Sequence, residues 1–367
     1  MSSSPAASFA DLPGIAARAL RDGRRRVAVV FLDAFGWRFV QRHASHPLLS
    51  RIAREGTLAP IASQFPSTTV AHVTTLHTGL PVEAHGLYEW RVLEPSVGRV
   101  VRPFVAEDLD GVDVRALLPE GPSFYQRLIT TSGVPSRLFQ PFERSAYDEV
   151  AVRGAETEVY DGLAEGARSL AAALDASDRL YGYLYFDGID ATGHAHGPSS
   201  PEFDDACLRA LDAVYVAFFG PDAPELDDTL LLLTADHGQI EVSPDRIDDV
   251  DLLVPGLGDR LIAGPAGSPR DLFLHVAPED VERTVADLSG ALGDHATVVP
   301  SRSLFPAAGP RLLHRLAPIC VLPSPGRTAW LSTMHGTSQT YLGHHGGRTP
   351  EESTTFLGTL VLGRRGG

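Results

Sequence analysis

The sequence predicts an α/β fold, with a mostly parallel central sheet covered by helices on both faces. Three short apolar runs, at residues 27–32, 181–186 and 229–233, have the continuous hydrophobic character of strands that are buried on both faces. Helical patterns lie between and around them, at residues 158–177 and 201–219. Alternation of buried strands with amphipathic helices is typical of a parallel sheet whose crossover connections cover both faces.

The chain of 367 residues is longer than a typical single domain, so we expect one large domain with an insert, or two domains. Residues 1–22 are expected to form an N-terminal leader and a helix. The core is predicted to comprise residues 23–241 and 336–367, and to end in an apolar strand. Between these two parts, residues 242–335 are rich in Pro and Gly and contain short helix and strand patterns. This composition, with its short helix and strand patterns, predicts a small α+β cap insert.

Composition excludes several classes of function. The formal net charge of -15 argues against a nucleic-acid polymer as partner, because phosphate backbones are bound by basic patches. A small phosphorylated substrate remains compatible, since bound divalent cations can reverse the local field. The chain contains neither Lys nor Asn, which excludes a P-loop lysine, a Schiff-base lysine and N-glycosylation.

The sequence also favours a cytoplasmic location. The two cysteines, Cys207 and Cys320, could form one disulfide at most, which is too few to stabilise a chain of this size. Their small number fits a reducing compartment. The N-terminus lacks the basic and apolar segments of a signal peptide. The apolar run at residues 27–32 is far too short to span a membrane, so we expect no membrane partner.

Each of the three predicted strands runs into acidic residues. Asp33 follows the first strand, Asp187 and Asp190 follow the second, and Asp236 follows the third. In open parallel sheets, ligands bind beyond the carboxyl ends of the strands. One Asp at a strand end commonly caps a turn or a helix. Carboxylates from three strands at one edge favour a binding site instead.

A candidate nucleophile lies in the segment of residues 65–86. Ser67 and Thr68 are helix-start signals, and Gly79 is placed to end the helix, so Thr69 is expected in the first helical turn. Unpaired N–H groups and the helix dipole there favour an alkoxide and a bound phosphate. A threonine hydroxyl needs activation, and with no adjacent base in the sequence a metal is the natural activator. Taken alone, Thr69 fits a helix cap better than a nucleophile.

Three further segments contain residue types that bind metals. Asp190 and His194 are four residues apart and could face one cation, with Asp187 and His196 as rivals. Imidazole and carboxylate ligands suit Zn²⁺ or Mn²⁺. In the sequence T-A-D-H-G, Asp236 and His237 can share a site only if the strand has already ended, and Gly238 permits that. In G-H-H-G, His344 or His345 could be a ligand.

In this order, the segments resemble the type I phosphodiesterase/nucleotide pyrophosphatase family of the alkaline phosphatase superfamily. The shared pattern is an Asp after the first strand, P-x-x-T before T-G and H-G, D-x-x-x-H-x-x-G-P, D-H-G and a late G-x-H-G. This chain has the five elements at Asp33 and at residues 66–69, 190–198, 236–238 and 343–346. The resemblance implies an alkaline-phosphatase-like core, and the predicted insert falls where the family carries a cap.

The resemblance also implies two divalent metal ions, Zn or Mn, and a role for each residue. Asp190, His194 and His345 would hold one ion. Asp33, Asp236 and His237 would hold the other. Thr69 would contact that second ion and attack phosphorus, forming a phospho-threonine intermediate. His194 is thereby favoured over His196, and His345 over His344.

The sequence departs from the family at Trp90. Many members place an Asn four residues after the His-Gly that follows the nucleophile helix, where it binds a phosphate oxygen. Trp90 occupies that position here. It is a candidate substrate contact through stacking on a base, although packing in the core is the favoured alternative.

The implied function is hydrolysis of a small, nucleotide-type phosphodiester, with a cyclic dinucleotide second messenger as one candidate substrate. A phosphomonoesterase or a phosphonate hydrolase of the same superfamily is the first alternative. A non-catalytic nucleotide-binding sensor is the second, although retention of Thr69 with all six ligand residues argues against it. A sulfatase is disfavoured because no C-x-P-x-R or S-x-P-x-R segment occurs at the nucleophile.

Overall fold

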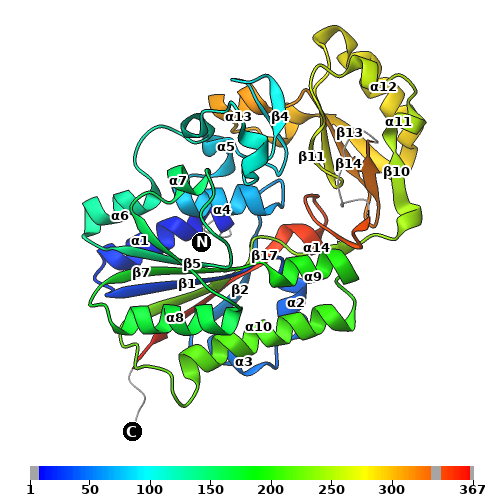
Figure 1. Ribbon diagram of the computed structural model, residues 1–367. Helices are drawn as coiled ribbons and strands as arrows, with labels where there is room; N and C mark the ends of the chain where they lie inside the picture. Colours follow the sequence, from blue (N-terminus) through cyan, green and yellow to red (C-terminus); the bar gives the residue numbers. More distant parts are fainter. Residues whose placement is uncertain (1–7, 332–339, 364–367) are drawn as a thin grey trace, which may run out of the picture.

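The computed structural model describes residues 8–331 and 340–363 (Figure 1). At its centre is a seven-stranded sheet with the strand order β2-β17-β8-β1-β7-β5-β6. The strands are β1 (Arg26–Leu32), β2 (Thr57–Ala62), β5 (Ser136–Gln140), β6 (Ala155–Val159), β7 (Leu180–Phe186), β8 (Thr229–Thr234) and β17 (Thr354–Leu362). β1 is parallel to its neighbours β7 and β8, whereas β17 is antiparallel to β8 and β2. The structure confirms the predicted α/β fold with a mostly parallel sheet.

Helices cover both faces of the sheet, as Figure 1 shows. One face carries α1 (Leu12–Arg21), α4 (Thr69–Thr78) and α6 (Phe124–Ser132). The other carries α2 (Trp37–Arg42), α3 (Pro47–Glu55), α8 (Leu163–Asp175) and α10 (Pro201–Phe219). The helix expected within residues 1–22 is α1, and residues 1–7 lie outside the described residues.

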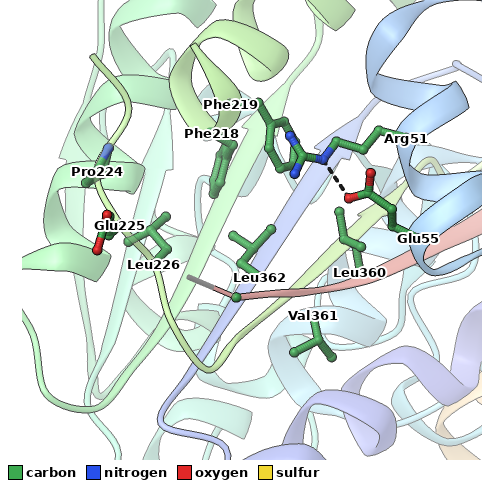
Figure 2. A pocket seen from close by; sticks show the side chains of 11 residues that line it. Arg51, Glu55, Phe218, Phe219, Pro224, Glu225, Leu226, Leu360, Val361 and Leu362 are labelled. Atoms are coloured by element: carbon green, nitrogen blue, oxygen red, sulfur yellow. Dashed lines mark hydrogen bonds and ion pairs between the residues drawn. The ribbon is translucent and has the colours of Figure 1, made fainter. Parts of the chain in front are cut away.

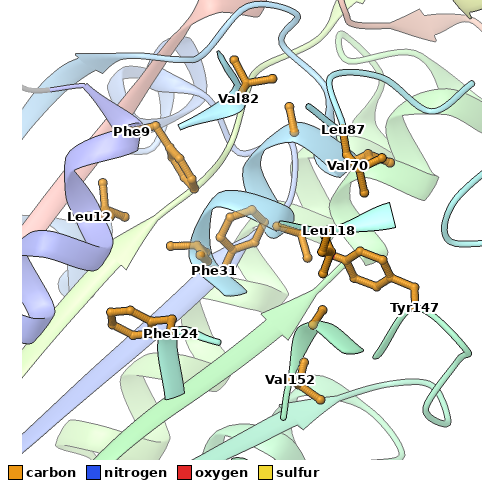
Figure 3. Close-up of a cluster of buried hydrophobic side chains, with 14 of the residues drawn as sticks. Phe9, Leu12, Phe31, Val70, Val82, Leu87, Leu118, Phe124, Tyr147 and Val152 are labelled. Carbon is orange, nitrogen blue, oxygen red and sulfur yellow. The ribbon is translucent and has the colours of Figure 1, made fainter. Parts of the chain in front are cut away.

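Two hydrophobic cores form because successive side chains of a strand point to opposite faces. In β1, Val27, Val29 and Phe31 belong to the first core. Ala28, Val30 and Leu32 belong to the second. Figure 3 shows Phe31 within the first core, together with Val70 of α4 and Phe124 of α6. Both faces of β1 are therefore buried, as its continuous apolar run predicts.

Glycines with positive φ set the bounds of two helices. α4 ends at Thr78, directly before Gly79, which has a φ of 64° and terminates the helix as the sequence predicts. The helix predicted over residues 158–177 is shorter than expected, because α8 begins only at Leu163. The residues before it complete β6, which pairs with β5 as far as Val159, and Gly162 then has a φ of 88°. That left-handed conformation favours glycine and separates the strand from the helix.

A second, smaller sheet lies in the later part of the chain, at the upper right of Figure 1. Its strand order is β11-β12-β14-β13, and all its pairs are antiparallel. The strands are β11 (Ala266–Ser268), β12 (Asp271–Leu274), β13 (Ala296–Pro300) and β14 (Ile319–Pro323). With α12 (Val281–Leu292), it encloses its own core around Leu272, Leu288 and Val321. The bounds predicted for the cap insert, residues 242 and 335, stay a proposal. Residues 332–335 lie outside the described residues.

Shorter elements connect these parts. The strands are β3 (Val92–Glu94), β4 (Arg99–Val101), β9 (Ile240–Glu241), β10 (Ile247–Asp249), β15 (Thr328–Trp330) and β16 (Gly343–His344). The α-helices are α5 (Val82–His85), α7 (Asp148–Ala151), α9 (Gly188–His196), α11 (Val250–Leu253), α13 (Pro310–Arg315) and α14 (Pro350–Ser353). The 3-10 helices are η1 (Phe9–Asp11), η2 (Ala106–Leu109), η3 (Val114–Leu117), η4 (Pro244–Arg246), η5 (Gly258–Arg260), η6 (Pro278–Asp280), η7 (Gly293–His295) and η8 (Ser301–Leu304). Among the described helices, none has the length and apolar character needed to cross a bilayer.

The second core predicts a large loss of stability on truncation of Leu231, which is 1% exposed in β8. Replacing Leu231 with Ala should lower the free energy of unfolding by about 2–5 kcal/mol, because burial is lost and a cavity remains. Val361→Ala in the neighbouring strand β17 is the control, since this side chain is 46% exposed and should change stability by less than about 0.5 kcal/mol. Urea denaturation measures both, and equal losses would contradict the assignment of Leu231 to the core.

Candidate metal centre

Three neighbouring strands place the predicted site residues at one edge of the sheet. Asp33 directly follows β1. α9 begins after β7 and carries Asp190 and His194 one helical turn apart. β8 ends before Asp236 and His237, so these two residues are no longer held on opposite faces of a strand. The carboxyl ends of β8, β1 and β7 thus meet where parallel sheets bind ligands.

Asp33, Asp236 and His237 form a first group of possible metal ligands, with ligand atoms that all lie within 4.8 Å of one another. His237 Nε2 is 3.5 Å from Asp33 Oδ1 and 3.2 Å from Asp236 Oδ2. All three side chains are buried. Asp236 Oδ1 accepts hydrogen bonds from the N–H groups of Ala34 and His237, whereas Oδ2 is buried with no hydrogen-bond partner among the described residues. A cation is a suitable partner for that oxygen.

A second group within 4.8 Å consists of Asp190, His237 and His345. His345 Nε2 lies 3.7 Å from Asp190 Oδ1, and His194 Nε2 lies 3.1 Å from the other oxygen, Oδ2. The rings of His237 and His345 stack with their centroids 3.7 Å apart. The two groups are therefore contiguous, and His237 belongs to both. The structure brings together all six residues to which the resemblance assigns ligand roles.

Each of the three site histidines has its Nδ1 hydrogen-bonded to a backbone carbonyl. His194 Nδ1 is 2.8 Å from Gly343 O, His237 Nδ1 is 3.0 Å from Gly238 O, and His345 Nδ1 is 3.0 Å from Ser67 O. A carbonyl oxygen only accepts, so Nδ1 must carry a proton, and in the neutral imidazole Nε2 then keeps its lone pair. This is the arrangement by which proteins orient metal-binding histidines.

The rival residues lie elsewhere. His344 is buried, and its Nε2 is 3.0 Å from the carbonyl oxygen of Tyr341. His196 is exposed at the last position of α9, and Asp187 precedes the helix. None of the three belongs to either ligand group, and neither does His194, which is placed at the site by its 3.1 Å contact with Asp190 Oδ2. This geometry supports His345 and His194 as the ligands.

Thr69 is the first residue of α4 and faces the first ligand group. Its Oγ1 is 3.3 Å from Asp33 Oδ2 and 3.3 Å from His237 Nε2. N–H groups in the first turn of an α-helix have no partner within the helix and carry a partial positive charge. The hydroxyl therefore lies beside both candidate metal ligands and groups that can bind a phosphate oxygen.

Two residues that support the site were not predicted from the sequence. The fully buried Gln239 donates from Nε2 to the carbonyl oxygen and Oδ1 of Asp190. Tyr185, in β7, donates its hydroxyl to Asp33 Oδ2. Gln239 directly follows D-H-G, which was the only available signal, and nothing in the apolar run of β7 distinguishes Tyr185.

The carboxylates of the site differ in electrostatic environment. Burial raises the pKa of Asp33 well above its ordinary value, and Asp236 and Asp190 raise it further. Burial also raises the pKa of Asp236, to about 7. Burial acts in the same direction on Asp190, but His194, His345 and His237 outweigh it and lower the pKa of that carboxyl. The raised pKa values of Asp33 and Asp236 reflect crowded negative charge at the first group, which a divalent cation would compensate.

Trp90 lies outside this arrangement. It is half-buried, packs beside the first core, and meets Phe104 edge-on with ring centroids 6.1 Å apart. This contact favours the packing alternative, and a role for Trp90 in substrate binding stays a prediction.

A pocket of about 250 Å³ occurs at the opposite edge of the sheet (Figure 2). It is lined by Arg51, Phe219 and Leu362 among others, and Figure 2 shows Arg51 paired with Glu55. Leu362 pairs with the first residue of β8, far along the strand from Asp236. None of its lining residues is a candidate metal ligand, so the pocket gives no support for a second metal centre.

Comparisons with known proteins agree with this geometry. The family model described as type I phosphodiesterase / nucleotide pyrophosphatase matches residues 27–348. Murine ectonucleotide pyrophosphatase / phosphodiesterase 5 has a TM-score of 0.73 at 19% identity, over 91% of this chain and 88% of that chain. An inactive variant of that murine protein has a threonine replaced by alanine and is in complex with AMP. It has a TM-score of 0.73 at 19% identity, over 92% of this chain and 88% of that chain. The human ectonucleotide pyrophosphatase / phosphodiesterase 5 has a TM-score of 0.70 at 18% identity, over 91% of this chain and 87% of that chain. At these identities the likeness to solved structures shows a shared fold.

The first ligand group predicts metal binding that depends on Asp236. Replacing Asp236 with Asn should weaken the binding of one of two divalent ions by more than about 10-fold, because an anionic donor is lost beside Asp33. Isothermal titration with Zn²⁺ and Mn²⁺ measures the affinity, and the metal content of the purified protein measures the stoichiometry. Asp204→Asn is the control, since Asp204 pairs with Arg42 near the surface. Two ions bound with unchanged affinity in Asp236→Asn would contradict the assignment.

Proposed function

We propose that this chain hydrolyses a small, nucleotide-type phosphodiester, because it belongs to the type I phosphodiesterase/nucleotide pyrophosphatase family. As a member of that family it is a hydrolase that acts on phosphoester bonds. The proposal concerns its substrate, its nucleophile and its metals. The observation that carries it is the position of Thr69 Oγ1 at the start of α4, 3.3 Å from both Asp33 and His237.

Two divalent ions, Zn or Mn, fit the residues present. We assign Asp190, His194 and His345 to one ion, and Asp33, Asp236 and His237 to the other, with Thr69 beside the second. Asp236 Oδ2, which accepts no hydrogen bond from a described residue, and Nε2 of the three histidines, whose Nδ1 is hydrogen-bonded to the backbone, support this assignment. When bound, such ions supply Lewis-acid stabilisation of the attacking and leaving oxygens and ease deprotonation of a hydroxyl or a water.

The residues of the chain itself orient the nucleophile and bind the phosphate. Asp33 accepts the hydrogen bond of the Thr69 hydroxyl, which directs Oγ1 toward the edge of the sheet. Thr69 Oγ1 attacks phosphorus in line with the leaving oxygen, which gives a phospho-threonine and releases the first product. N–H groups of the first turn of α4 stabilise the charge on the phosphoryl oxygens. Attack of water on phosphorus then restores Thr69 and releases the second product.

The similar solved structures support the nucleotide class and the threonine. The murine variant in which alanine replaces a threonine is described as inactive and binds AMP. By analogy, we propose a nucleotide-type diester as substrate here and Thr69 as the essential threonine. A cyclic dinucleotide is one candidate. The free, buried Cys207 and Cys320 support a cytoplasmic location, where such messengers occur.

Activity on two model substrates tests the proposed reaction. The chain loaded with Zn²⁺ or Mn²⁺ should hydrolyse bis(p-nitrophenyl) phosphate with a kcat/KM at least about 10-fold above that for p-nitrophenyl phosphate, a difference of about 1.4 kcal/mol in activation free energy. Release of p-nitrophenol measures both rates. The reverse preference would favour the phosphomonoesterase. Absence of turnover with tight AMP binding would favour the nucleotide sensor.

Replacement of Thr69 tests the nucleophile. Thr69→Ala should lower kcat by about 10³-fold or more, because no oxygen remains to attack phosphorus. Thr69→Ser keeps the hydroxyl and should retain measurable turnover. Metal content should stay at the wild-type level in Thr69→Ala, since the six other ligand residues are unchanged. Substantial activity of Thr69→Ala would rule out the proposed phospho-threonine.

A further inference from the structure

A fully buried ion pair joins the small sheet to the loop that carries His345. Arg270 lies in the turn between β11 and β12, and Glu352 lies in α14; their side chains are 1% and 0% exposed. Arg270 Nε is 3.0 Å from Glu352 Oε1, and Nη2 is 2.9 Å from Oε2, so the contact is bidentate. Arg270 Nη1 donates to the carbonyl oxygens of Pro323, Ser324 and Arg327. The guanidinium is thus compensated by a carboxylate and hydrogen-bonded without access to water.

Glu352 also accepts hydrogen bonds from the segment that follows His345. Its Oε1 accepts a hydrogen bond of 2.9 Å from the N–H of Gly347, and its Oε2 accepts one of 2.7 Å from the Thr349 hydroxyl. A Cβ on Gly347 would lie 2.9 Å from Arg270 Nη2 and from both carboxylate oxygens. The ion pair therefore occupies the space that a side chain at position 347 would need.

The loop at residues 345–347 is in turn hydrogen-bonded to Ser67. Ser67 Oγ donates to Gly347 O (2.9 Å) and accepts from the N–H of Gly346 (3.1 Å). Ser67 N donates to Gly346 O (3.3 Å), and Ser67 O accepts from His345 Nδ1 (3.0 Å). Ser67 precedes Thr69 by two residues. One set of hydrogen bonds thus fixes the ring of His345 and the turn that starts the nucleophile helix.

We propose that Arg270 and Glu352 are positioning residues for the active site, through which the small sheet holds His345 and the turn before Thr69 in place. The inference rests on the proposed function, because it takes His345 as a metal ligand and Thr69 as the nucleophile. A buried ion pair contributes little net stability compared with apolar side chains of the same volume, so stability alone does not explain it. A positioning role explains the pair, because Glu352 is hydrogen-bonded to the backbone of the loop at residues 345–347, which carries His345. Residues that hold a metal ligand in place set its orientation and the metal affinity.

The chain offers a matched control. Arg315 and Glu94 form a second buried ion pair, with both side chains 4% exposed and Nη2 2.8 Å from Oε2. It joins α13 to β3. Arg315 Nη2 also donates to Ala116 O, and Ser96 donates to Glu94 Oε1 through its N–H and its hydroxyl. That pair therefore shares charge, burial and bond length with Arg270 and Glu352 but has no bond to the loop at residues 345–347.

The test compares Arg270→Lys with Arg315→Lys in the full chain. Lys keeps the charge at both positions. At position 270 it loses a bidentate contact, and at position 315 it loses a contact that Nη2 makes alone. Arg270→Lys should weaken the binding of one of two Zn²⁺ or Mn²⁺ ions roughly 10- to 100-fold by isothermal titration, and lower kcat on bis(p-nitrophenyl) phosphate more than it changes KM. Arg315→Lys should leave metal affinity within about twofold of wild type at a comparable loss of Tm. Glu352→Gln is the second variant and should weaken the same ion.

The outcomes separate this inference from the proposed function. Equal effects of Arg270→Lys and Arg315→Lys on metal affinity, or wild-type affinity in both Arg270→Lys and Glu352→Gln, would overturn the positioning role while wild-type turnover stands. A wild-type chain that binds two ions without turnover would overturn the proposed function, and the metal titrations would still decide the role of the pair. A wild-type chain that binds neither Zn²⁺ nor Mn²⁺ would overturn both.

Discussion

Two buried carboxylates, Asp33 and Asp236, meet at the ends of adjacent parallel strands, and their mutual repulsion governs the site. β1 and β8 are paired in parallel over their length, so the backbone cannot separate the residues that follow them. In a buried environment two neighbouring carboxylates ionise together only if positive charge lies beside them. The raised pKa values of both groups follow from this constraint and from burial. Neutral imidazoles that present Nε2 complete a donor set that suits divalent cations.

The sequence predicts those parts of the molecule that depend on local patterns. Three strands appear within a residue or so of their predicted ranges, because continuous apolar runs are typical of strands buried on both faces. α4 begins at Thr69 and ends directly before Gly79 for reasons visible in the sequence. The site residues could be named because each lies at a strand end or in a motif shared with a family.

Other features depend on contacts between residues that are distant in sequence, and no local pattern indicates them. The amide of Gln239 binds Asp190 only because the segment after β8 lies beside α9 in the folded chain. The hydroxyl of Tyr185 binds Asp33 only because β7 pairs with β1. The partner of Arg270 lies 82 residues away. The sequence places the start of α8 too early, because Val159 and Tyr160 lie at helical spacing from Leu163, where the helix begins.

The packing around Gln239 limits the order in which this site can change during evolution. A Cβ on Gly193 would lie 1.9 Å from Gln239 Oε1, and one on Gly343 would lie 2.5 Å from the same atom. The amide cannot simply swing aside, because its other end is bonded to Asp190. A lineage can therefore acquire a side chain at position 193 only after position 239 has become shorter. At position 343 even that is insufficient, because the backbone oxygen of Gly193 lies 2.4 Å from the added Cβ.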